Sequence, residues 1–134
     1  MRRLVPLALL LLLFTGCSTV DEKKKSMTLQ STIRAYESTI RWGDFETAYG
    51  FIKLDEVEDP GPEPRDLKTI KVTAYVSQIV NVSEDGTEAQ VVAEISYYNE
   101  RRMSVVDMVD RQTWHYDAEI GKWYLVTPLP DFKY

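Results

Sequence analysis

The sequence predicts an α+β fold, with N-terminal helices packed on an antiparallel sheet of about four strands. Apolar residues recur at helical spacing between Met27 and Ile52, which is typical of amphipathic helices. From Ile70 onwards apolar and polar residues alternate, which is typical of half-buried strands. Turn residues, among them the pair Asp85-Gly86, separate these alternating runs at hairpin-like intervals.

Residues 1–16 have the features of an export signal. Arg2-Arg3 is a positive start, the apolar run Leu4–Phe14 follows, and the small residues Thr15 and Gly16 end the segment. As a helix the run would reach about 16 Å, roughly half of the ~30 Å hydrocarbon core of a bilayer. A membrane-spanning anchor is therefore the weaker interpretation, and Leu4 onwards does not continue a twin-arginine motif.

Phe14-Thr15-Gly16-Cys17 resembles the lipobox of bacterial lipoproteins, with Phe14 in place of the usual Leu. The resemblance implies that Cys17 becomes a lipid-modified first residue; a free thiol or an intermolecular disulfide is the alternative. Two or three acyl chains hold a protein to a membrane stably. Because Ser18 rather than Asp follows, the resemblance implies the periplasmic leaflet of the outer membrane in a Gram-negative cell.

The composition beyond the signal is that of one acidic globular domain. Over the whole chain, 44% of residues are hydrophobic and 28% are charged, which argues against disorder. The signal contains two of the 16 basic residues and none of the 21 acidic ones, so the remainder has a net charge of −7. This charge argues against nucleic acid as a partner. The partners we expect are the membrane, through the lipid anchor, and an envelope protein or a second copy of the chain.

The region after Cys17 divides into a tether, residues 17–26, and a single domain, residues 27–134. Ser18–Ser26 is polar and aperiodic, and predicts an extended linker with a reach of about 30 Å. Within it Lys23–Lys25 either contacts anionic lipid or is simply solvated.

Two helices are expected at the start of the domain. The first has one apolar face, and Gly43 can end it in the left-handed conformation. Asp44 can cap a second helix that runs to about Ile52. The apolar face of the first helix consists of Leu29, Ile33, Tyr36 and Ile40.

Residues 54–66 are acidic, contain three prolines and predict a surface loop. Strands are expected over 70–82, 89–97, 103–116 and 123–126. In the first strand Ile70, Val72, Ala74 and Val76 alternate with more polar residues. Pro128 and Pro130 are expected to end the sheet.

The helix pair around Trp42-Gly43-Asp44, followed by strands containing Gln112-Thr113-Trp114 and Trp123-Tyr124-Leu125, resembles the nuclear transport factor two-like (cystatin-like cone) superfamily. The resemblance covers about residues 27–126 and implies a strongly curved sheet that wraps around the helices. It departs from the superfamily where the proline-rich loop replaces a third helix, leaving a turn near Glu63–Thr69. No catalytic residue of the superfamily matches a position in this chain.

A polar interruption in the third strand is the candidate ligand site. Asp110 and Gln112 share the even-numbered face with Trp114, so they either line a pocket or form hydrogen bonds inside the core. Asp107 points to the opposite face and cannot pair with Asp110. His115, the only histidine, is expected to be half exposed. We therefore predict no catalytic, cofactor-binding or metal-binding residue, and expect an envelope-tethered binding or support module rather than an enzyme.

Overall fold

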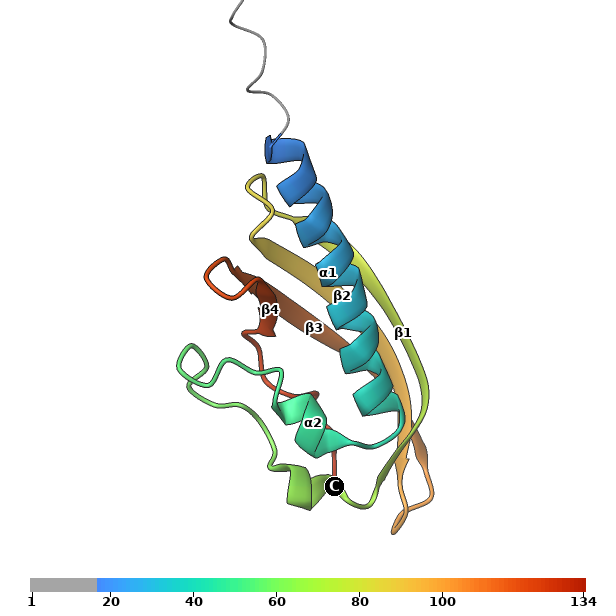
Figure 1. Ribbon diagram of the computed structural model, residues 1–134. Helices are drawn as coiled ribbons and strands as arrows, with labels where there is room; N and C mark the ends of the chain where they lie inside the picture. Colours follow the sequence, from blue (N-terminus) through green and yellow to red (C-terminus); the bar gives the residue numbers. More distant parts are fainter. Residues whose placement is uncertain (1–16) are drawn as a thin grey trace, which may run out of the picture.

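The computed structural model describes residues 17–134, so the predicted signal, residues 1–16, lies outside the described residues. Two helices cover one face of a four-stranded antiparallel sheet with strand order β1-β2-β3-β4 (Figure 1). The predicted α+β class with about four strands is confirmed. The strands are β1 (Ile70–Val82), β2 (Glu88–Asn99), β3 (Val105–Asp117) and β4 (Lys122–Leu125).

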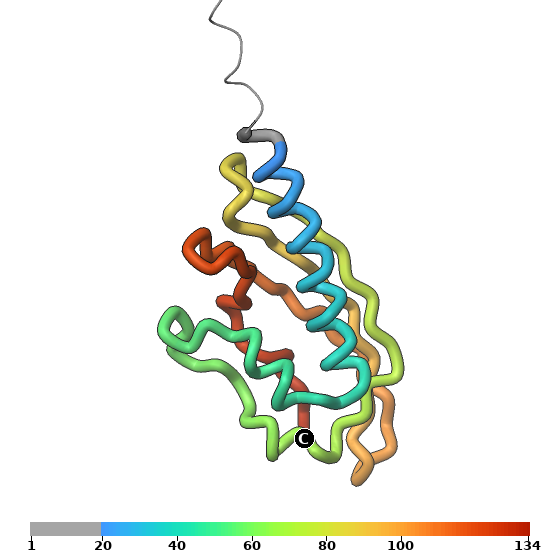
Figure 2. Tube along the Cα trace, in the orientation of Figure 1, coloured from blue at the N-terminus to red at the C-terminus, as the bar shows by residue number. Residues whose placement is uncertain are grey.

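Helix α1 (Cys17–Arg41) is 25 residues long and runs along the concave side of the sheet (Figure 2). Its predicted apolar face is buried: Leu29, Ile33, Tyr36 and Ile40 all belong to the core. The helix begins ten residues before Met27, so the expected extended conformation of Ser18–Ser26 is wrong.

Two causes explain the longer helix. Glu22 and the three lysines that follow it are good helix formers. The sheet also contacts this part of α1, because Trp123 Nε1 donates a hydrogen bond to the backbone oxygen of Lys25 at 3.1 Å. The Lys25 amine lies 5.6 Å from the centre of the Tyr116 ring.

The turn after α1 follows the sequence prediction. Gly43 has a positive φ of 75°, and the Asp44 side chain accepts a hydrogen bond from the Thr47 amide at 3.2 Å. Helix α2 (Phe45–Tyr49) ends before the expected Ile52, which instead forms a single bridge to Leu125 of β4. A short 3-10 helix, η1 (Pro64–Leu67), is the expected turn at the end of the proline-rich loop.

A bulge in β1 changes which side chains face the helices. The β1–β2 register shifts between Val72 and Ala74, so the simple alternation predicted for this strand is wrong beyond Val72. Tyr75 therefore turns into the core, while Val76 is 64% exposed on the other side of the sheet.

The C-terminal segment completes the core. Leu129 and Phe132 are buried, and the Phe132 ring packs edge-on against Tyr97 at 4.9 Å and Phe45 at 5.5 Å between centroids. The Lys133 amide donates a hydrogen bond to the Tyr97 hydroxyl at 2.9 Å. This segment covers one end of the concave sheet face, a role that its prolines alone did not indicate.

Candidate functional site

The predicted residues Asp110, Gln112 and Trp114 lie side by side on the concave face of β3, all buried. The Gln112 amide nitrogen donates to Asp110 Oδ2 at 2.9 Å and to the Tyr75 hydroxyl at 2.8 Å. Trp114 Nε1 donates to the Gln112 carbonyl oxygen at 3.1 Å. The Gln112 side chain therefore has a partner for every donor and for its acceptor. We refer to these four residues as the inner chain.

Burial perturbs the acidic end of the inner chain. Desolvation raises the pKa of Asp110 from 3.8 to about 6, and the hydrogen bond from Gln112 offsets part of that rise. Desolvation also raises the pKa of Tyr75, and the nearby Asp110 carboxylate adds to the effect. The carboxyl group can thus gain or lose a proton near neutral pH, which an exposed aspartate cannot do.

Tyr36 adds an unpaired polar atom beside the inner chain. Its hydroxyl is fully buried and has no hydrogen-bond partner among the described residues. Burial, followed by the charge of Asp110, raises the pKa of this phenol well above its ordinary value. The ring itself is held edge-on against Trp114, with 5.3 Å between centroids. A buried unpaired hydroxyl destabilises a fold, so Tyr36 marks the one unsatisfied position in this part of the described core.

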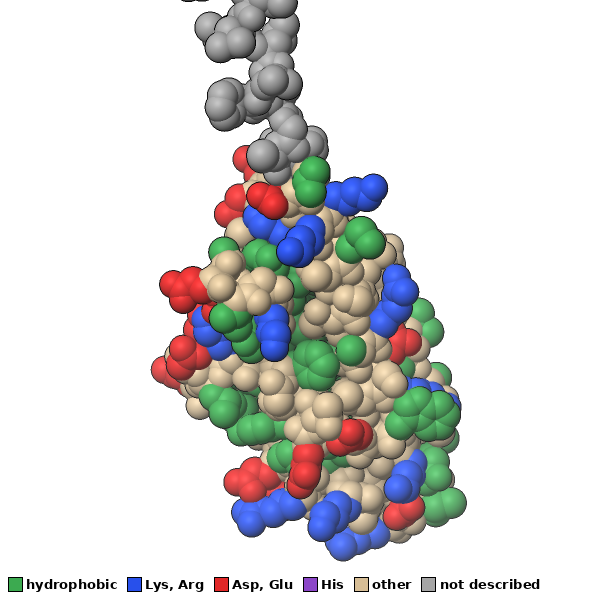
Figure 3. Space-filling model, viewed as in Figure 1, with side chains coloured by type: hydrophobic (Ala, Val, Ile, Leu, Met, Phe, Trp, Pro, Cys, Tyr) green, Lys and Arg blue, Asp and Glu red, His purple; other side chains and the backbone are tan. Residues whose placement is uncertain are grey.

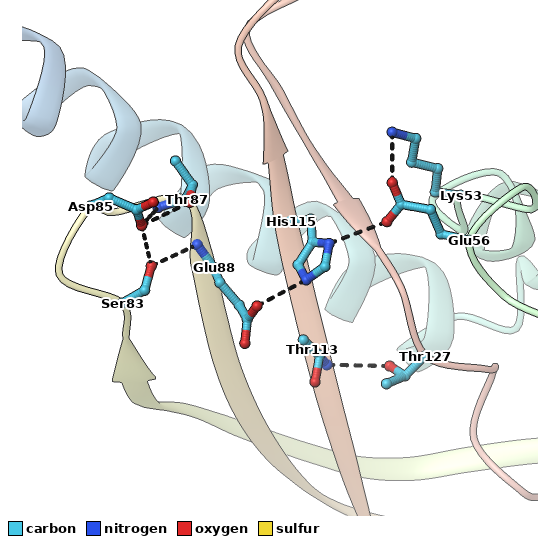
Figure 4. A network of polar contacts seen from close by, with 9 residues as sticks. All are labelled: Lys53, Glu56, Ser83, Asp85, Thr87, Glu88, Thr113, His115 and Thr127. Carbon is cyan, nitrogen blue, oxygen red and sulfur yellow. Dashed lines mark hydrogen bonds and ion pairs between the residues drawn. The ribbon is translucent and has the colours of Figure 1, made fainter.

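A second polar cluster lies on the opposite side of β3. His115, half exposed as expected, places Nδ1 3.2 Å from Glu56 and Nε2 3.1 Å from Glu88 (Figure 4). Lys53 approaches Glu56 at 3.0 Å. We refer to these four residues as the outer cluster; it borders a shallow hollow of about 200 Å³ that Asp117 and Tyr124 also line.

Charge pairing rather than burial sets the electrostatics of the outer cluster. The hydrogen bond from Lys53 lowers the pKa of Glu56, and the contact with His115 adds to that shift. The hydrogen bond with Glu56 in turn raises the pKa of Lys53. A neutral imidazole has one donor and one acceptor nitrogen, so only a protonated His115 donates to both carboxylates at once. The cluster links the loop after α2 to β2 and β3.

Neither cluster provides a set of side chains that could coordinate a metal ion. Within residues 17–134, no three His, Cys, Asp or Glu side chains converge to hold a metal ion. Asp107 lies on the outer side of β3, as predicted, where it accepts a hydrogen bond from Ser96 at 2.5 Å. It therefore does not join Asp110.

The side of the sheet away from α1 carries exposed valines. The register places Val76, Glu94 and Val109 in one row across β1, β2 and β3. Val76 and Val109 are 64% and 54% exposed, and Val105 at the start of β3 is 66% exposed. We refer to this side as the outer sheet face; its apolar groups are mixed with charges rather than forming one continuous patch.

Comparison with known proteins adds no assignment: no family model, no curated protein and no solved structure matches this chain. No helix in the described part of the chain, residues 17–134, is long and apolar enough to cross a membrane.

Sequence reasoning found the polar half of the inner chain but not its partners. Tyr36 was expected in the core, yet nothing in the helical pattern indicated that its hydroxyl would lack a partner. Tyr75 was missed because a bulge cannot be read from alternation alone. The contact of His115 with Glu88 follows from the β2–β3 register, in which the two residues are paired. Glu56 comes from an irregular loop, and no sequence signal placed it there.

Proposed function

We propose that this protein is an envelope lipoprotein, anchored through lipid on Cys17, whose α+β domain binds or supports another envelope component. The observation that carries the proposal is the order of a positive start, an apolar run of eleven residues and Phe14-Thr15-Gly16-Cys17. In a Gram-negative host, Ser18 after the cysteine favours the outer membrane.

Two features favour a binding or support role over catalysis. The polar side chains of the inner chain hydrogen-bond to one another, and the C-terminal segment covers part of the concave face. Val76, Val105 and Val109 are exposed on the outer sheet face, and we place the contact with a protein partner or a second copy of the chain there. The order of helices and strands also supports the proposed relation to the nuclear transport factor two-like superfamily.

Metabolic labelling with palmitate tests the anchor. The wild-type protein should incorporate label and the Cys17→Ser variant should not; equal labelling of both would disprove lipidation. In a Gram-negative host, density-gradient fractionation should place the wild type with outer-membrane markers. Ser18→Asp should move it to the inner membrane, while Ser18→Ala serves as the matched control.

A photocrosslinking amino acid at Val76 tests the partner surface in intact cells. The proposal predicts adducts of defined mass from this position, and no such adducts from Lys68, an exposed position at the end of η1. An adduct of twice the chain mass identifies a homodimer. Indistinguishable products from both positions would remove the outer sheet face as the binding surface.

A second candidate function is a small-ligand-binding or enzymatic cone that uses Asp110 and Gln112. The unpaired Tyr36 hydroxyl and the raised pKa of Asp110 favour it, because both are typical of polar groups kept for a ligand. Titration with anilinonaphthalene sulfonate, an anionic dye whose fluorescence rises when its aromatic rings leave water, separates the two functions. Saturable binding that Asp110→Asn alters supports the cone, whereas unchanged dye fluorescence supports the filled core.

A further inference from the structure

The side of α1 that points away from the sheet carries exposed apolar residues at both ends. At about 100° per residue, Val20 and Met27 fall opposite the buried stripe of the helix. Trp42 directly follows the last helical residue, and the same spacing places it on this side. The side chains of Val20, Met27 and Trp42 are 66%, 64% and 77% exposed. We refer to the residues within about 75° of this direction, between Val20 and Trp42, as the outer face of α1.

Every charged residue on the outer face of α1 is basic, in a domain whose net charge is −7. The acidic residues of the same helix lie elsewhere: Asp21 and Glu22 fall outside the outer face, and Glu37 accepts a hydrogen bond from Ser77 of β1 at 3.0 Å. Figure 3 looks onto the α1 side of the molecule, where lysine and arginine side chains lie in its upper and right-hand part. The exposed basic residues of the outer face are Lys23, Lys24 and Arg34. Arg41 also falls on this side by spacing, but it is half-buried and donates a hydrogen bond to the Val72 carbonyl oxygen of β1 at 2.6 Å.

Basic side chains interspersed with exposed apolar ones are the composition of a surface that lies in the headgroup region of an anionic bilayer. We propose that the outer face of α1 lies along the membrane, so that the domain rests on its helical side instead of hanging from its N-terminal tip. This inference rests on the lipid anchor proposed above. With the chain already held at the membrane through Cys17, weak contacts with lipid are sufficient to set the orientation, because they form at high effective concentration.

The packing of α1 makes this an orientation of the whole domain. The helix cannot swing away freely, because its N-terminal half is bonded to β4 at Lys25 and its C-terminal half is buried at Tyr36 and Ile40. In a two-layer fold the outer sheet face then points away from the bilayer. The surface proposed for a protein partner would therefore remain accessible.

The position of Trp42 distinguishes a domain that lies along the membrane from one that is attached only at its N-terminal end. Trp42 is 25 residues beyond Cys17, which is about 37 Å along the helix axis. A domain that hangs from its tip holds Trp42 far from the lipid, and a domain that lies on α1 brings it to the headgroups. Trp42 is also the only exposed tryptophan of the three, since Trp114 and Trp123 are buried.

The experiment reconstitutes the full lipidated protein in vesicles of phosphatidylethanolamine and phosphatidylglycerol that contain brominated acyl chains. We expect bromine to quench a distinct part of the tryptophan emission, and Trp42→Phe to remove that part. Neutralising Lys23, Lys24 and Arg34 to Gln should abolish the quenching while the protein still floats with the vesicles. Neutralising Lys68, Arg101 and Arg102, which are equally exposed but lie elsewhere, should leave it intact.

The outcomes separate the two proposals. Protein that does not float with the vesicles overturns the lipid anchor and the orientation together. Protein that floats with Trp42 unquenched overturns the orientation alone, and so does quenching that survives neutralisation of the three basic residues. If Trp42 is shielded from the water-soluble quencher acrylamide in native membranes but not in pure lipid vesicles, a protein covers the outer face of α1. That result would also overturn the lipid proposal.

Discussion

The two sides of β3 treat acidic side chains in opposite ways. On the concave side, Asp110 is buried beside Gln112 and its pKa rises to about 6. On the other side, His115 and Lys53 surround Glu56, and the pKa of that carboxyl group falls below its ordinary value. The groups are carried by or packed against one strand, yet burial dominates in one cluster and charge pairing in the other.

Polar groups influence the stability of this fold far more on the concave side of β3 than on the other side. Water does not reach the atoms of the inner chain, so only its internal hydrogen bonds satisfy its polar groups. An unpaired or charged group there lowers the free energy of unfolding substantially. In the outer cluster water competes for every contact and salt screens it, so exposed ion pairs contribute little. Substitutions in the inner chain should therefore change the free energy of unfolding more than substitutions in the outer cluster.

Trp114→Ala should have the largest effect. Truncation of a fully buried Trp removes its contact with Tyr36 and leaves a cavity, which costs about 3–5 kcal/mol in the free energy of unfolding. Trp42→Ala is the matched control, because it makes the same change at a site that is 77% exposed. Urea unfolding of the lipid-free domain, residues 18–134, gives both values. Equal losses in the two variants would contradict the inward position of Trp114.

Asp110→Asn should stabilise the domain at neutral pH. Asparagine keeps an oxygen that accepts from Gln112 but carries no charge to desolvate. The raised pKa, from 3.8 to about 6, corresponds to roughly 3 kcal/mol of destabilisation above pH 6. The gain in the variant is therefore at most about that size, and Asp107→Asn on the exposed side is the control.

The pH dependence gives the sign of the Asp110 effect independently. The folded state binds this proton more tightly than the unfolded chain, so the wild type is most stable below about pH 3.8 as far as this group is concerned. Its contribution should fall as pH rises from 3.8 to about 6 and then level off. Asp110→Asn should remove this slope; a slope that persists unchanged in the variant would assign it to another group.

Tyr36→Phe and Tyr75→Phe should shift stability in opposite directions. The first removes a buried hydroxyl without a partner, which should raise the free energy of unfolding by about 1 kcal/mol. The second removes the hydroxyl that accepts from Gln112 and should lower it by a similar amount. Both substitutions delete one oxygen from a buried tyrosine. Thermal unfolding of the two variants side by side checks the prediction, and a loss of stability in Tyr36→Phe would mean that its hydroxyl has a partner.

The sequence predicted much of the fold because its apolar periodicity reports burial directly. The stripe from Leu29 to Ile40, the strand expected over 89–97 and the turns at Gly43 and Gly86 all follow from local spacing and backbone conformation. The predicted start of the first helix, at Met27, was wrong because the polar residues before it show no helical periodicity. Contacts that come from the distant Trp123 hold that part of the helix.

The candidate site was predictable only in part, for a related reason. Asp110 and Gln112 interrupt an apolar face, which is a visible anomaly in one strand. The partners that make the site, Tyr36 and Tyr75, reach it from a helix and past a bulge. Their arrangement depends on tertiary packing. The core position of Phe132 was not predicted for the same reason. A single aromatic residue that follows Pro130 and precedes Lys133 is not part of a periodic apolar pattern.

Salt should change the pKa of the acidic group on one side of β3 and not on the other, and this is the smallest effect that we predict. Raising the ionic strength from 0.1 to 1 M shortens the screening length from about 10 Å to about 3 Å. The lowered pKa of Glu56 depends on contacts with Lys53 and His115 at the solvent-exposed surface, so it should move back towards its ordinary value. The raised pKa of Asp110 comes mainly from burial, which salt does not screen, and should stay near 6. Carboxyl carbon NMR titrations at both salt concentrations measure the two groups in one sample. If Asp110 shifted as much as Glu56, water would have to reach the inner chain, and the two sides of β3 would differ only in degree.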